Sequence, residues 1–114
     1  MTMNLYTPDK WVVIRTTVDG ETIEKVLASF YGGFTGSNSW KLSSGITKVI
    51  EHEKHFDFIN YSGSTYRCHK ECQGMSGYTT GVFLQMVEQV KHLTEVTEFA
   101  IIENYGQSES STDK

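Results

Sequence analysis

The segment Trp11-Val12-Val13-Ile14-Arg15-Thr16-Thr17-Val18-Asp19-Gly20 sets the architecture of the chain. Seven of its first eight residues are β-branched or aromatic, a composition typical of strands. Asp19-Gly20 is a dipeptide favoured in two-residue type I′ turns, because glycine adopts a positive φ without steric cost. The segment therefore predicts a β-hairpin whose second strand runs from residue 21 to about residue 31.

The two-residue loop also predicts the register of this hairpin. The expected pairs on one face are Thr16 with Ile23, Ile14 with Lys25, and Val12 with Leu27. The expected pairs on the other face are Arg15 with Glu24, an ion pair, and Val13 with Val26, an apolar pair. Because both faces carry apolar residues, we expect the hairpin to be covered on more than one side, as in a curled sheet or small barrel.

The rest of the chain supplies the other elements of such a fold. A loop rich in glycine and short polar residues spans residues 32–39. Strands are predicted at residues 40–51, with a bulge at Gly45, and at residues 56–61, 64–68 and 98–105. Apolar residues at helical spacing predict one amphipathic helix over residues 80–93. The prediction is a single α+β domain over residues 1–105, with a barrel-like antiparallel sheet of five to six strands and one helix packed on it, followed by a flexible polar tail over residues 106–114.

Charge and hydropathy exclude several functional classes. The chain has 114 residues, with 10 Lys and Arg against 14 Asp and Glu, and its formal net charge is −4. Without clustered positive charge, binding to nucleic acid is not expected. The apolar runs are far shorter than the roughly 20 residues that cross a bilayer, and the first residues lack a secretory pattern. We therefore expect a cytoplasmic protein with reduced cysteines and no membrane partner.

A cluster of thiols and imidazoles raises the possibility of zinc binding. The residues that could provide ligands are Cys68, His69, Cys72, His52 and His55. Thiolate and imidazole are the ligands that Zn²⁺ prefers, but this spacing departs from the recurring structural sites. Cys68 and His69 are also adjacent in a predicted strand and should face opposite ways. We therefore expect neither a metal centre nor a cofactor.

The start of the predicted helix is a candidate anion site. Glycines and hydroxyls precede the first helical turn, where free N–H groups attract negative charge. The candidate residues are Gly74, Ser76, Gly77, Thr79 and Thr80, with charge added by Arg67 and Lys70. The segment matches neither the Walker nor the dinucleotide fingerprint. Alternatively, Thr79 or Thr80 caps the helix and the glycines only let the chain turn.

Two further interpretations concern catalysis and protein binding. His69 or His55 could act with Tyr66, Arg67 and Lys70 on a phosphodiester, but no spacing singles out this chemistry, so the sequence does not favour an enzyme. Several aromatic residues lie at or beside predicted turns, where Tyr and Trp often anchor interfaces. The candidate protein-binding residues are Tyr31, Phe34, Trp40, Tyr66 and Tyr78. Alternatively, these rings close the ends of a small barrel.

Four segments resemble small uncharacterised accessory proteins of large tailed bacteriophages. They are Asp9-Lys10-Trp11-Val12-Val13, Tyr31-Gly32-Gly33-Phe34, Trp40-Lys41-Leu42-Ser43-Ser44-Gly45-Ile46 and Tyr61-Ser62-Gly63-Ser64-Thr65-Tyr66-Arg67-Cys68-His69. The resemblance covers roughly residues 5–95 and implies a non-virion protein, made in the host cell cytoplasm, that binds and modulates a host protein. Self-association through an exposed strand edge is a further expectation. The alternative function is a module that binds a phosphorylated or nucleotide-like anion at the helix start.

Overall fold

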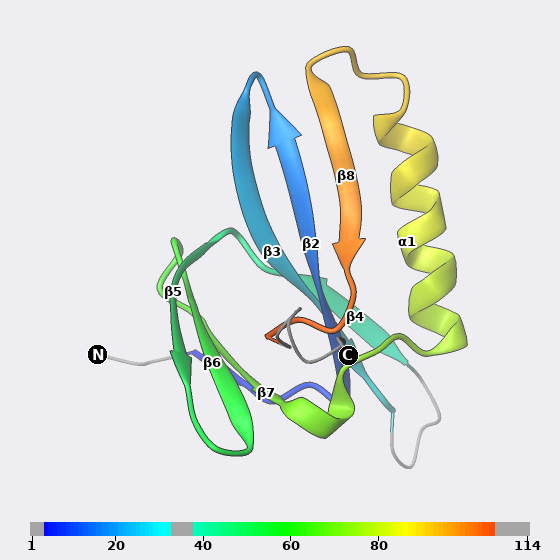
Figure 1. The fold of residues 1–114 in the computed structure, drawn as a ribbon. Helices are drawn as coiled ribbons and strands as arrows, with labels where there is room; N and C mark the ends of the chain where they lie inside the picture. The colour runs from blue at the N-terminus through cyan, green and yellow to red at the C-terminus, as the bar shows by residue number, and fades with distance from the viewer. Residues whose placement is uncertain (1–3, 33–37, 107–114) are drawn as a thin grey trace, which may run out of the picture.

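The computed structural model describes residues 4–32 and 38–106 (Figure 1). The elements in chain order are β1 (Leu5–Tyr6), β2 (Lys10–Val18), β3 (Glu21–Phe30), β4 (Ser39–Leu42), β5 (Ile46–Glu51), β6 (His55–Asn60), β7 (Thr65–His69), a short 3-10 turn (Lys70–Cys72), α1 (Gly77–Val90) and β8 (Val96–Ile102). This confirms the α+β class and the single predicted helix among the described residues. No helix in this part of the chain is long and apolar enough to cross a membrane.

The register predicted for the β2–β3 hairpin is confirmed at all five pairs. Val12 opposes Leu27, Ile14 opposes Lys25 and Thr16 opposes Ile23. Arg15 opposes Glu24, and Val13 opposes Val26. Asp19 and Gly20 both have positive φ angles, of 52° and 81°, as a type I′ turn requires. The local turn chemistry therefore determines the pairing of the longest two strands.

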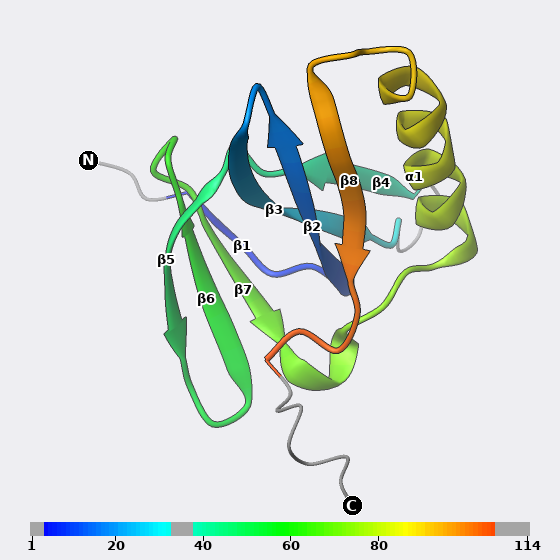
Figure 2. The ribbon, with the colours of Figure 1, turned by 45° about the horizontal axis from the view of Figure 1, so that its top comes forward.

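The strands form two sheets that pack face to face (Figures 1 and 2). The first, here called the β2 sheet, has the order β4-β3-β2-β8 and is antiparallel. The second, called the β6 sheet, has the order β1-β7-β6-β5, and its β1–β7 pair is parallel. Helix α1 covers the other face of the β2 sheet. The fold thus has three layers and is not one closed barrel of consecutive antiparallel strands, which corrects that finer part of the prediction.

The main correction to the strand assignments falls at residues 40–51. This segment is two strands, β4 in the β2 sheet and β5 in the β6 sheet, with the break at residues 43–45. The Ser43 hydroxyl accepts a hydrogen bond from the Val26 amide at 2.8 Å, and the Ser43 amide donates to the Val26 carbonyl at 2.9 Å. Ser43 thereby holds the chain at the β2 sheet where it leaves for the other layer, so Gly45 lies in a crossing and not in a bulge.

Other boundaries moved by a few residues. Helix α1 begins at Gly77 instead of residue 80, because Ser76 is its N-cap and accepts a hydrogen bond from the Thr79 amide. Strand β8 begins at Val96, two residues earlier than predicted, and ends at Ile102. Strand β1 was not predicted, because two residues are too few to show a period.

Two apolar clusters hold the layers together. Between the sheets, Trp11 is fully buried and its ring meets Phe56, Phe58 and Tyr105 at centroid distances of 5.5 to 6.4 Å. Its indole N–H donates to the His69 carbonyl at 2.7 Å, a bond that ties the two sheets together. Beneath α1, the buried residues are Val12, Ile14 and Leu27, packed by residues that include Phe83 and Phe99. Both faces of the β2–β3 hairpin are therefore covered, as its sequence predicts.

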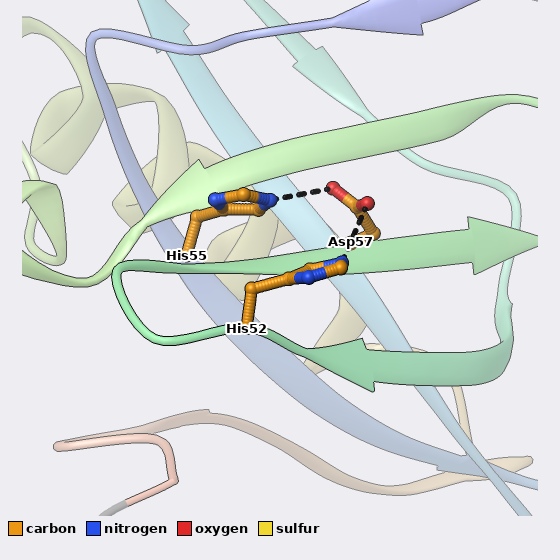
Figure 3. Close-up of side chains that lie close together, drawn as sticks. All are labelled: His52, His55 and Asp57. Atoms are coloured by element: carbon orange, nitrogen blue, oxygen red, sulfur yellow. Dashed lines mark ion pairs between the residues drawn. The ribbon is translucent and has the colours of Figure 1, made fainter.

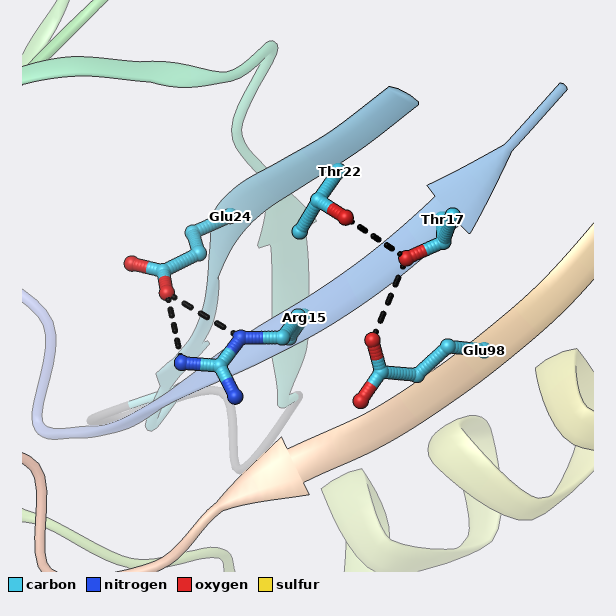
Figure 4. Close-up of polar contacts among 5 residues, drawn as sticks. All are labelled: Arg15, Thr17, Thr22, Glu24 and Glu98. Carbon is cyan, nitrogen blue, oxygen red and sulfur yellow. Dashed lines mark hydrogen bonds and ion pairs between the residues drawn. The ribbon is translucent and has the colours of Figure 1, made fainter. Parts of the chain in front are cut away.

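The face of the β2 sheet that carries Trp11 and Val13 becomes polar towards the tip of the hairpin (Figure 4). Arg15 donates to the Glu24 carboxylate at 3.1 Å, which confirms the expected ion pair. Thr17 donates to Glu98 of β8 at 3.1 Å and accepts from Thr22 of β3 at 2.8 Å. The hydrogen bonds of Thr17 thus link β2 to both β3 and β8 near the hairpin tip.

Candidate functional site

The outer face of the β6 sheet carries a cluster of ionisable side chains. Alternation along β6 turns Phe56 and Phe58 into the core and leaves His55 and Asp57 on the opposite face. Strand β7 repeats the arrangement, with Cys68 in the core and Arg67 and His69 outside. The antiparallel register places His55 opposite His69 and Asp57 opposite Arg67. One face of two paired strands therefore presents two imidazoles, a carboxylate and a guanidinium.

Asp57 is the centre of this cluster (Figure 3). Arg67 donates from Nε to Oδ1 at 3.0 Å and from a terminal nitrogen to Oδ2 at 3.2 Å. His52 Nε2 lies 3.3 Å from Oδ2, and His55 Nε2 lies 3.6 Å from Oδ1. Figure 3 shows both imidazole rings directed at the carboxylate. Each carboxylate oxygen thus has one guanidinium nitrogen and one imidazole nitrogen as neighbours.

The surroundings favour the ionised form of Asp57 and the neutral form of His55. Hydrogen bonding from Arg67 holds the pKa of the Asp57 carboxyl below its usual value, and burial opposes this effect. The same hydrogen bond raises the pKa of Arg67. Burial lowers the pKa of His55, and the Asp57 charge acts in the opposite direction. Neutral imidazole and ionised carboxylate are the forms in which these groups bind cations.

The five residues considered as zinc ligands do not come together. Cys68 is fully buried among apolar residues, and burial raises the pKa of its thiol, while Cys72 packs against the same core. His69 lies on the opposite face from Cys68, as the strand alternation predicts. Its ring is 5.8 Å from that of His55. Only His52 and His55 of the set share a site, and their partner is Asp57.

Asp57 itself was missed by the sequence interpretation. The signal was present in the pattern His55-x-Asp57, because residues two apart in a strand share a face. The antiparallel hairpin of β6 and β7, which turns at residues 61–64, then adds Arg67 and His69 to that face. The contribution of His52 could not be anticipated in this way, because it lies in the β5–β6 turn.

The predicted anion site is largely occupied by contacts within the protein. Ser76 Oγ accepts from the Thr79 amide, and the buried Thr79 hydroxyl is hydrogen-bonded to Ser29 and Ser76. The Thr80 hydroxyl donates to the Ser76 carbonyl at 2.9 Å, and the Gly74 amide donates to the Trp11 carbonyl at 2.7 Å. Gly77 is the first residue of α1. The structure therefore favours a helix cap over a ligand loop, although the capping residue is Ser76 and not Thr79 or Thr80.

The two cations assigned to that anion site have other partners. Arg67 is bound to Asp57, and the Lys70 ammonium lies 2.6 Å from a Glu51 carboxylate oxygen. The catalytic set of His55 or His69 with Tyr66, Arg67 and Lys70 is also divided. Tyr66 is 4% exposed and points into the core, behind the strand face that carries Arg67.

The candidate protein-binding aromatics separate into exposed and buried residues. Tyr31, Trp40 and Tyr78 are 49%, 40% and 41% exposed. Tyr66 instead packs between the sheets, with its ring centroid 5.0 Å from that of Tyr6, and Phe34 lies outside the described residues. Trp40 is the cross-strand partner of Ser29, whose hydroxyl bonds to Thr79 next to Tyr78. The hydrogen bond between the buried Ser29 and Thr79 hydroxyls therefore holds the strand pair that carries Trp40 close to the helix turn that carries Tyr78.

A groove runs along β4 on the side that faces the β6 sheet. Its volume is about 630 Å³, and its lining combines hydroxyl, amide and aromatic residues from β4, β1 and the β6–β7 turn: Asn4, Tyr6, Trp40, Lys41, Leu42, Ser43, Ser44, Ser62, Ser64 and Tyr66. The Lys41 ammonium lies 5.1 Å above the Tyr6 ring. A second hollow of about 570 Å³, between the start of β3 and the start of β5, includes Glu21, Glu24 and Tyr61.

Comparisons with models of known protein families, with curated proteins and with solved structures found no match.

Proposed function

We propose that this chain is a non-enzymatic binding protein that holds an extended segment of a partner protein along β4. The observation that carries the proposal is the position of Trp40, an aromatic residue that is 40% exposed on an edge strand bordering the groove. Edge strands with open backbone groups and an adjacent anchor residue are a recurring means of peptide recognition.

The exposed edge of β4 supports strand addition. Within the described residues β4 pairs with β3 alone, so its other edge is without a strand partner. Ser39, Trp40 and Lys41 are all exposed, and the strand has only four residues. Short edge strands resist uncontrolled pairing, whereas a partner that matches the flanking side chains gains main-chain hydrogen bonds and specificity together.

The two faces of β4 supply different chemistry for such a partner. Trp40 pairs with Ser29, whose hydroxyl contacts α1, and it also lines the border of the groove, so its exposed part can cover an apolar side chain of the partner. Lys41 lies in the groove on the opposite face, among serine hydroxyls. A carboxylate of the partner would meet both the Lys41 ammonium and these hydroxyl donors. The best occupant is thus an extended peptide with an apolar residue next to an acidic one.

The source of the partner is a further part of this proposal and rests on the resemblance to phage accessory proteins alone. A protein of the infected host would supply the peptide, and binding in the host cytoplasm would occlude or redirect it. Self-association is a separate prediction, for which β5 offers another edge strand with Val49 and Ile50 each 37% exposed.

The test is affinity capture from host lysate with the full chain, followed by measurement of binding to the purified captured protein. We expect Trp40→Ala and Lys41→Glu each to weaken binding at least tenfold while the circular dichroism spectrum is unchanged. Leu84→Ala, at a side chain 57% exposed on α1, and Lys54→Glu, in the β5–β6 turn, are the matched controls.

Three results would contradict the proposal: no stoichiometric protein partner, equal binding by Trp40→Ala and the wild type, or equal losses in the two control variants. Native mass spectrometry of the purified protein distinguishes protein binding from the alternative function, which is anion binding. A retained phosphate-containing adduct would favour anion binding.

A further inference from the structure

We propose that the outer face of the β6 sheet binds one divalent first-row transition-metal ion through His52 Nε2, His55 Nε2 and the Asp57 carboxylate. Zn²⁺ is the reference ion, because two imidazoles and a carboxylate suit it and it has no strong geometric preference. This site is independent of the proposed peptide groove and differs from the expectation of no metal centre.

The spacing of the three ligands fits a single ion. Zn²⁺ binds imidazole nitrogen and carboxylate oxygen at about 2.0 to 2.2 Å, so tetrahedral ligand atoms lie about 3.3 to 3.5 Å apart. His52 Nε2 and Asp57 Oδ2 are 3.3 Å apart, and His55 Nε2 and Asp57 Oδ1 are 3.6 Å apart. One ligand atom from each residue lies within 4.8 Å of the others. Closing the site around one ion therefore requires the ligand atoms to approach one another by up to about 1.4 Å, and the exposed His52 side chain has room to move by this amount.

A buried nitrogen in the cluster is without a hydrogen-bond partner. His55 Nε2 is shielded from solvent and makes no hydrogen bond, since its 3.6 Å separation from Asp57 is too long for one. Leaving a buried polar atom unsatisfied costs free energy, and such atoms in folded proteins usually indicate a function or a bound species. A metal ion between His55 and Asp57 would satisfy this nitrogen.

The backbone preorganises the two imidazoles. The His52 amide donates to the His55 carbonyl at 2.8 Å, which closes the β5–β6 turn. The two rings stack with centroids 4.4 Å apart, so both Nε2 atoms are directed to the same carboxylate (Figure 3). Asp57 follows on the same face of β6, and the ligand pattern is His-x2-His-x-Asp.

Arg67 is the one full positive charge that contacts Asp57 in the described residues, and it opposes a cation. Its guanidinium uses one lone pair on each Asp57 oxygen, and an ionised carboxylate offers about four acceptor sites. The Arg67 side chain is 41% exposed, so water screens its repulsion. In this arrangement Arg67 orients the carboxylate, as hydrogen-bonding residues behind a metal ligand do. The side chain of His52 is 45% exposed, which leaves access for a water molecule at the fourth position.

Isothermal titration of the full chain with ZnCl₂, and visible absorption of its Co²⁺ form, test the proposal. We expect one ion per chain and at least tenfold weaker binding in His52→Ala, in His55→Ala and in Asp57→Asn. His92→Ala controls for a histidine outside the cluster, and Cys72→Ala controls for the thiols. Because Asp57 is paired and 8% exposed, Asp57→Asn could unfold the chain, whereas the exposed His52 side chain makes His52→Ala a safe variant.

The proposal is overturned if the wild-type chain shows no saturable binding of Zn²⁺ or Co²⁺. It is also overturned if His52→Ala binds as tightly as the wild type, or if Cys72→Ala loses the ion instead. A Co²⁺ spectrum with strong thiolate charge-transfer bands would likewise contradict a nitrogen and oxygen ligand set.

Discussion

Replacing Trp11 by phenylalanine removes a hydrogen bond between the two sheets and part of the packing in the core that joins them. The indole N–H donates to the His69 carbonyl at 2.7 Å and phenylalanine cannot, so that carbonyl loses a partner at a cost of about 1–3 kcal/mol. Trp11 is fully buried, and the ring atoms lost beside Phe56 and Phe58 carry about 1.5 kcal/mol of burial, before any cavity cost. We expect the free energy of unfolding to fall by about 3 kcal/mol.

This loss is large against the roughly 5–15 kcal/mol that stabilises a domain of this size. Urea unfolding followed by far-ultraviolet circular dichroism would measure it, with an expected fall in midpoint of about 1.5 M at an unchanged slope. Trp40→Phe is the matched control, because Trp40 is 40% exposed, and its cost should stay below about 0.5 kcal/mol. Equal losses for the two variants would refute the assignment of Trp11 as the link between the layers.

Two further predictions concern ionisable groups in the core. Burial raises the pKa of the Cys68 thiol, so this thiol should not react with a thiol reagent in the native protein. We expect one reactive thiol per native chain, that of Cys72, and two in denaturant. Fast labelling of Cys68 in the native protein would contradict its placement in the core. Burial also raises the pKa values of Tyr66 and Tyr105, which means that the folded state holds the phenolic protons more tightly than the unfolded state does. Their contribution to stability should therefore be constant below pH ~10 and lost as the pH rises above it; Tyr66→Phe should show a shallower alkaline loss in urea melts, and an identical loss would contradict the burial argument.

Local chemistry was predictable wherever it depended on near neighbours. The Asp19-Gly20 turn determined a register that the structure reproduces pair by pair. The helix was predicted from its apolar stripe, but its start was placed three residues too late, because Ser76 was not recognised as the cap. The placement of Cys68 and His69 on opposite faces followed from strand alternation alone.

The candidate sites depended on contacts between distant residues. Residues 40–51 contain enough strand formers for one strand, and only the competition between two sheets shows that they divide at Ser43. Because of this division, β4 is an edge strand of the β2 sheet and lies beside the groove. Likewise, Trp40 is exposed and Tyr66 is buried because of how the layers pack. The sequence does not distinguish them, because each is an aromatic residue beside a predicted turn.

The amino-acid sequence alone determined the α+β class, the central hairpin with its register, and the presence of one helix, because these follow from turn chemistry and from the periods of strand and helix. Tertiary packing determined the division into two sheets, the exposed edge of β4 and the grouping of His52, His55 and Asp57. Apolar periodicity states which face of a strand is buried, but it does not state which other strand covers that face. That choice depends on the long-range fit of side chains between layers, which a single sequence does not reveal.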